Sequence, residues 1–113
     1  MAADLFKRVI AETLGELPGP IREKLASVTV LVQEHPPRGE DEDLLGLFIG
    51  VPYSEKVGNA QPEADRIILF RRNLEEMCEN DEELEDEIRI TLLHEIGHYL
   101  GLDENELTDR GLE

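Results

Sequence analysis

The hydrophobic positions of the first 17 residues recur at helical spacing. They form one stripe, made of Leu5, Phe6, Val9, Ile10, Thr13, Leu14 and Leu17. A period of three to four residues predicts an amphipathic helix, and Pro18-Gly19-Pro20 supplies its end. A second, short helix is expected over residues 21–26.

Three later runs are apolar and rich in β-branched or aromatic residues, which is typical of short strands. They are VTVLVQ (28–33), LLGLFIGV (44–51) and RIILF (66–70). Pro52 ends the second run or places it at a sheet edge. The segments between the runs, 34–43 and 53–65, are polar and predict loops. A short helix through Leu74 and Met77 is expected after the third run.

A longer helix is expected over residues 81–100. Asn80 and Glu83 have the spacing of a capping box, and acidic residues occupy the first turn, where the helix dipole favours them. The apolar positions of this helix are Leu84, Ile88, Leu92, Leu93, Ile96 and Leu100. Gly101 is the expected stop. The order of elements predicts an α+β fold, and we expect one domain covering residues 1–113.

Composition narrows the class of protein. With 40% hydrophobic and 34% charged residues among 113, the chain suits a globular domain rather than a disordered one. A net charge of −16 argues against nucleic acid or an anionic membrane as partner. No apolar run is long enough for a membrane span or a secretory signal, and the single cysteine forms no internal disulfide. We therefore expect a cytoplasmic location.

The candidate chemistry lies in the sequence HEIGH, residues 94–98. His94 and His98 are one helical turn apart, so both imidazoles project from one face and can hold one metal ion. Glu95 is offset by about 100° from His94, which suits a carboxylate that acts on a metal-bound water. The H-E-x-x-H pattern is typical of zinc hydrolases, in which the glutamate is the general base. Thr91 and Glu87 extend the same polar face.

A third protein ligand is expected just after the helix. Gly101 can adopt the positive φ of a terminating turn, and that turn would return Asp103 or Glu104 to the metal. His35 and Cys78 are weaker candidates. His35 lies in a polar loop, and Cys78 has no second cysteine beside it, so we interpret it as a small core residue.

The sequence HEIGHYLGLDE, of the form H-E-x-x-H-x-x-G-x-x-acid, resembles the small bacterial zincin-like metallopeptidases. The likeness extends to LLGLFIGVPYSE and DRIILFRRNLE and covers about residues 28–112. This resemblance implies a minimal zincin fold, a small mixed sheet packed on the active-site helix, with one Zn²⁺. It also implies that His94 and His98 are ligands and that Glu95 is the catalytic base. By the same pattern the third ligand is Glu104, with Asp103 as the alternative.

Two functions remain open at this point. The first is a zinc-dependent metallopeptidase whose peptide or protein substrate aligns on a strand edge, either Ile67–Phe70 or the run 44–51. Tyr53 and Tyr99 are its available phenols for stabilising an oxyanion, although a structural role is the more common one. The second is a zinc-binding interaction or regulatory module with little proteolytic activity, which the short chain after the motif favours. An acidic protein that binds a basic partner is a lesser alternative.

Overall fold

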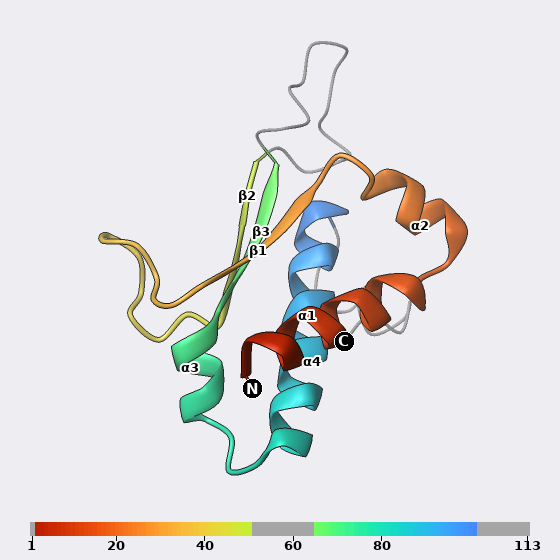
Figure 1. The fold of residues 1–113 in the computed structure, drawn as a ribbon. Helices are drawn as coiled ribbons and strands as arrows, with labels where there is room; N and C mark the ends of the chain where they lie inside the picture. The colour runs from red at the N-terminus through yellow and green to blue at the C-terminus, as the bar shows by residue number, and fades with distance from the viewer. Residues whose placement is uncertain (1, 51–64, 102–113) are drawn as a thin grey trace.

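The α+β fold expected from the sequence is confirmed. The computed structural model describes residues 2–50 and 65–101 (Figure 1). Its elements are α1 (Ala2–Gly15), α2 (Gly19–Lys24), β1 (Thr29–Gln33), β2 (Gly46–Ile49), β3 (Arg66–Phe70), α3 (Arg71–Glu76) and α4 (Asp81–Tyr99). Each expected helix and strand is present, with ends shifted by a few residues. No helix in the described ranges is both long and apolar enough to cross a bilayer.

The sheet is small and mixed, as expected, and β3 is its central strand. The strand order is β1-β3-β2, with β1 parallel and β2 antiparallel to β3. Ile67–Phe70 are all buried. A continuous apolar run fits a strand covered on both faces, so the composition of β3 explains its central place.

This topology corrects one expectation about the substrate edge. Ile67–Phe70 pair with strands on both sides, so they cannot offer a free edge to a peptide. The alternative run, 44–51, contains β2, which pairs with β3 alone among the strands that the structure describes. The prediction was open because an apolar run shows that a strand is buried but not which strands flank it.

Helix α4 packs its apolar stripe into the core. Ile88, Leu92 and Ile96 are fully buried and belong to the same core cluster as Phe6 and Val9 of α1. Figure 1 shows α1 crossing α4, which lies beside the sheet. Full burial of each such side chain contributes about 1.5–3 kcal/mol, so this stripe holds α4 in one orientation. The adjacent face of α4, which carries Thr91 and Glu95, is thereby directed toward β2.

Both ends of α4 follow their expected signals. The Glu83 backbone N–H donates to the side chain of Asn80 at 2.9 Å, and the Glu83 carboxylate accepts from the Glu79 N–H at 2.8 Å. At the other end Gly101 has φ +78°, which only glycine adopts without strain. The helix therefore starts and stops where local sequence chemistry directs it.

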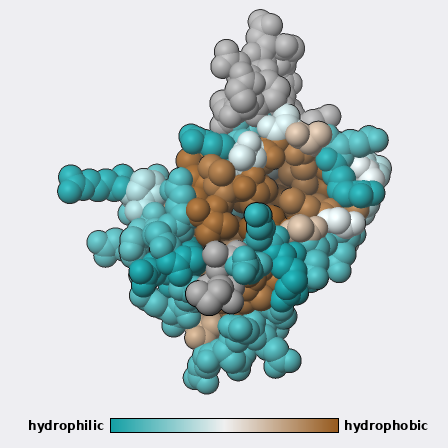
Figure 2. Space-filling model, in the orientation of Figure 1, coloured by the Kyte–Doolittle hydropathy of each residue, from teal (hydrophilic) through white to brown (hydrophobic). Residues whose placement is uncertain are grey.

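An apolar surface lies on the face of the molecule formed by α1 and β1. Figure 2 shows apolar side chains gathered there in a hollow. The hollow has a volume of about 990 Å³ and is lined in part by Ile10, Leu14, Val30 and Val32. The histidine face of α4 is separate from this hollow, since His94 and His98 line another cavity.

Candidate metal centre

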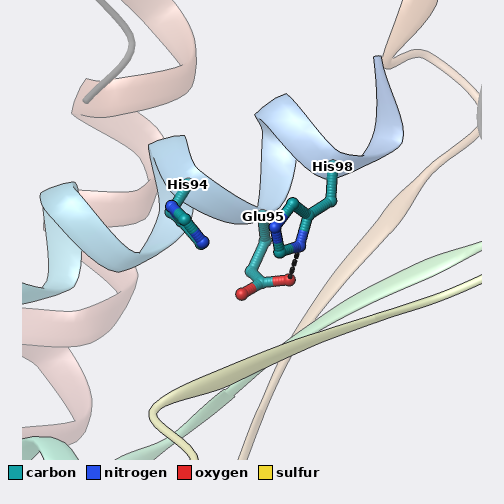
Figure 3. Close-up of side chains that lie close together, drawn as sticks. All are labelled: His94, Glu95 and His98. Atoms are coloured by element: carbon teal, nitrogen blue, oxygen red, sulfur yellow. Dashed lines mark hydrogen bonds and ion pairs between the residues drawn. The ribbon is translucent and has the colours of Figure 1, made fainter. Parts of the chain in front are cut away.

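Three potential metal ligands lie close together on α4. The donor atoms of His94, Glu95 and His98 are all within 4.8 Å of one another. The imidazole rings of His94 and His98 have centroids 4.5 Å apart and an interplanar angle of 68°. Figure 3 shows the three side chains directed toward one side of the helix. The four-residue spacing therefore produces the shared face that it predicted.

Glu95 reaches further round the helix than its position alone indicates. Its carboxylate Oε1 lies 3.3 Å from Nδ1 of His98 (Figure 3). A simple offset of about 100° per residue would place Glu95 to one side of the histidines. The flexible glutamate side chain makes up the difference, because it can bend back over the next turn.

The three side chains differ in their access to solvent. The side chain of Glu95 is 9% exposed, whereas that of His98 is 47% exposed. His94 is half-buried. Glu95 therefore lies at the floor of the site, and the imidazoles lie nearer to its opening.

These residues fit a zinc ion in chemistry and in spacing. Imidazole nitrogen and carboxylate oxygen are common zinc ligands at about 2.0–2.2 Å, which puts two ligand atoms of one tetrahedral ion about 3.4 Å apart. Donor atoms within 4.8 Å approach that separation, and small rotations about side-chain bonds can close the difference. His94 and His98 are thus suited to hold one ion, with Glu95 beside it.

Gly46 lets β2 pass close to the site, which the sequence reading missed. A Cβ atom at Gly46 would lie 2.8 Å from Thr91 Cγ2, 3.2 Å from Glu95 Cγ and 3.3 Å from the Ile68 carbonyl oxygen. Because Gly46 lacks that atom, the strand covers Thr91 and Glu95, and both are buried. A glycine inside a strand run is a known signal of close backbone approach, and this one was available in the sequence.

The site opens into a groove between β2 and α4. The groove has a volume of about 460 Å³, and its lining is Leu44, Leu45, Gly46, Leu47, Phe48, Glu87, Ile90, Thr91, His94, Glu95 and His98. The lining residues from β2 and the two before it are apolar, and the polar side chains, those of Glu87, Thr91, His94, Glu95 and His98, all lie on α4. An apolar cleft with a small number of convergent polar groups is typical of a binding site.

Three of the other candidates from the sequence, Tyr99, Cys78 and His35, lie within the described residues, and none of them joins the cluster on α4. Tyr99 is fully buried and its hydroxyl donates to the Lys24 carbonyl at 2.9 Å, so it serves the core rather than the groove. Cys78 packs against the core. Burial raises the pKa of its thiol, and the negative charge of Glu87 raises this pKa further. His35 is exposed beyond β1 and is not among the clustered donors.

Tyr53, Asp103 and Glu104 lie outside the described residues. The expected third ligand and the second phenol therefore stay predictions from the sequence. The φ of Gly101 supports the turn on which the prediction of Asp103 or Glu104 depends.

Comparison with known proteins identifies a family. The model of the zincin-like metallopeptidase family matches residues 25–112. The match includes β1, β2, β3 and all of α4. No curated protein matches the sequence significantly.

Proposed function

The chain belongs to the zincin-like metallopeptidase family, and we propose on this basis that it is a zinc-dependent peptidase. His94 and His98 are the proposed zinc ligands, and Glu95 is the proposed general base. The observation that carries the proposal is the cluster of these three donors, within 4.8 Å of one another, in the lining of one groove.

Zinc bound at this site would polarise the carbonyl of the scissile bond and would lower the pKa of a bound water toward roughly 7. The chain's own residues provide the rest of the chemistry. In this proposal Glu95 accepts the proton of the attacking water and returns it to the leaving amine. Its burial beneath β2 limits the positions of the carboxylate, and this orients it for proton transfer.

We propose a carboxylate as the third protein ligand. Glu104 is the residue that the motif indicates, and Asp103 is the alternative. The positive φ of Gly101 supports a sharp change of chain direction directly before them. The prediction is that Glu104→Ala loses bound zinc while Asp103→Ala retains it, measured by metal analysis of the purified proteins.

The proposed substrate is an extended peptide that adds to the edge of β2. An antiparallel strand on β2 would continue the antiparallel pairing of β2 with β3. Such a peptide would pass the groove and bring its backbone past His94, Glu95 and His98. Backbone hydrogen bonds would then hold many sequences, and the groove would select among their side chains.

The proposal is tested with wild type and Glu95→Gln, both loaded with zinc. The glutamine is close in size to the glutamate but cannot accept the proton. We expect wild type to cleave an unfolded protein or a peptide library, and Glu95→Gln to keep one zinc and lose the cleavage.

Two other outcomes would contradict the proposal. If zinc-loaded wild type cleaves nothing, a zinc-binding interaction module becomes the better account. If Glu95→Gln cleaves as fast as wild type, the hydrolysis has another origin, such as a contaminating protease.

A further inference from the structure

The groove continues beyond the proposed zinc ligands, along α4 toward its N-terminal half. Gly46 lies against Thr91 and Glu95, and Phe48 contacts Tyr99 edge to face with ring centroids 5.5 Å apart. Along the groove, β2 and α4 therefore run in the same N-to-C direction. The start of β2 and the residues before it lie at the end of the groove that Glu87 lines.

This end of the groove combines apolar walls with one carboxylate. Leu44 and Ile90 line it from outside the buried core, and Ile90 is 45% exposed. Glu87 is partly buried beside them. Within the described residues it forms no ion pair or hydrogen bond, in contrast to Glu85, which pairs with Arg8.

We propose that Glu87 is a specificity residue that selects substrates with a lysine or arginine after the scissile bond. The inference rests on the proposed peptidase function and adds a substrate class to it: an extended peptide with apolar residues near the bond and a basic residue beyond them. The apolar walls accommodate the aliphatic stem of the basic side chain, and Glu87 pairs with its charge. The net charge of −16 also draws basic peptides toward the protein.

The geometry gives the position of the basic residue. Glu87 precedes His94 by seven residues, which is about 10.5 Å along a helix that rises 1.5 Å per residue. An extended peptide advances about 3.3 Å per residue, so this distance corresponds to about three residues. A peptide antiparallel to β2 runs toward the start of that strand, so the residue near Glu87 is about the third one after the scissile bond.

The test uses two fluorescein-labelled peptides of the same apolar sequence, with lysine or glutamine at the third position after the intended scissile bond. Their affinities for zinc-loaded Glu95→Gln are measured by fluorescence anisotropy, so that turnover does not interfere. We expect the lysine peptide to bind about five-fold more tightly, which is the upper range for a solvent-accessible ion pair. Adding Glu87→Gln should abolish this preference. The matched control Asp86→Asn removes the same charge from an exposed position outside the groove and should leave the preference intact.

Cleavage of the same two peptides by the wild-type protein separates this inference from the proposed function. If wild type cleaves both peptides and the two bind with equal affinity, the proposed role of Glu87 is wrong. It is also wrong if neither peptide binds. A preference for the lysine peptide that persists in Glu87→Gln would also contradict the inference, because the preference would then not depend on Glu87. A preference that is lost equally in Asp86→Asn would contradict it too, because the preference would then reflect overall charge. A preference that depends on Glu87 without any cleavage would support the inference and contradict the peptidase function.

Discussion

Gly46 offers the sharpest test of how the fold builds the candidate site. Replacing it with alanine adds a Cβ atom 2.8 Å from Thr91 Cγ2, a distance that real Cβ contacts essentially never show. Two further contacts, to Glu95 Cγ at 3.2 Å and the Ile68 carbonyl oxygen at 3.3 Å, leave little room for the strand to move. Overpacking of this kind typically costs about 1–3 kcal/mol. Alanine also reduces the conformational entropy of the unfolded chain, and this raises the free energy of unfolding by about 0.4–1 kcal/mol. We therefore expect Gly46→Ala to lower the free energy of unfolding by about 1–2 kcal/mol.

The assay is urea denaturation of four variants. Gly15→Ala is the matched control, because nothing lies within 4 Å of a Cβ atom at that helix terminus, and its free energy of unfolding should be unchanged or slightly raised. Thr91→Ser removes the methyl group of the closest contact, so it should recover part of the loss when combined with Gly46→Ala. The double variant should thus show a coupling energy of about 0.5–1.5 kcal/mol. Gly46→Ala should also reduce any peptidase activity, since its Cβ atom presses on the Glu95 side chain.

Two results would refute this reasoning. The first is a Gly46→Ala protein as stable as Gly15→Ala, which would mean that β2 does not lie against α4 as described. The second is additivity of Gly46→Ala and Thr91→Ser, which would place the strain elsewhere.

Three further predictions concern the elements that hold α4 and the sheet in place. Tyr99→Phe removes the hydrogen bond to the Lys24 carbonyl and should lower the free energy of unfolding by about 1 kcal/mol in urea, while peptidase activity at the same temperature stays near wild type. A large loss of activity in a folded Tyr99→Phe protein would contradict the assignment of this phenol to the core. Asn80→Ala removes the N-cap of α4 and should cost about 1 kcal/mol, seen as a lower Tm, whereas Asn80→Asp should retain most of the stability. Hydrogen bonding from Arg71 lowers the pKa of Glu34, so this ion pair stabilises the folded state above the ordinary glutamate pKa of about 4.3 and loses its effect as the pH falls through the lowered value. The difference in unfolding free energy between wild type and Glu34→Gln should therefore be largest near neutral pH and shrink in acid, and a difference independent of pH would exclude the ion pair as its cause.

Much of the fold could be predicted because local chemistry decides it. The spacing of Leu84, Ile88, Leu92 and Ile96 predicted α4 and the face that it buries, and the caps at Asn80 and Gly101 predicted its ends. The clustering of His94 and His98 follows from the same helical period. These features depend on residues within a few positions of one another.

The parts that could not be predicted depend on contacts between distant segments. Strand order follows from how β1, β2 and β3 pair, and the pattern in Ile67–Phe70 does not show which neighbour lies on each side. The place of Gly46 over Thr91 and Glu95 joins residues that are more than 40 positions apart in the sequence. Glu87 belonged to the predicted polar face of α4, but only the position of β2 makes it part of a groove.

The central claim is that His94 and His98 hold a zinc ion beside Glu95, and metal analysis of purified protein tests it most directly. Wild type, Glu95→Gln, His94→Ala and His98→Ala are produced in zinc-supplemented medium, and the zinc content per chain is measured after removal of loosely bound metal. We predict one zinc in wild type and in Glu95→Gln and little or none in the two histidine variants, with all four remaining folded. A wild-type protein that retains no zinc, or histidine variants that retain as much as wild type, would contradict the claim.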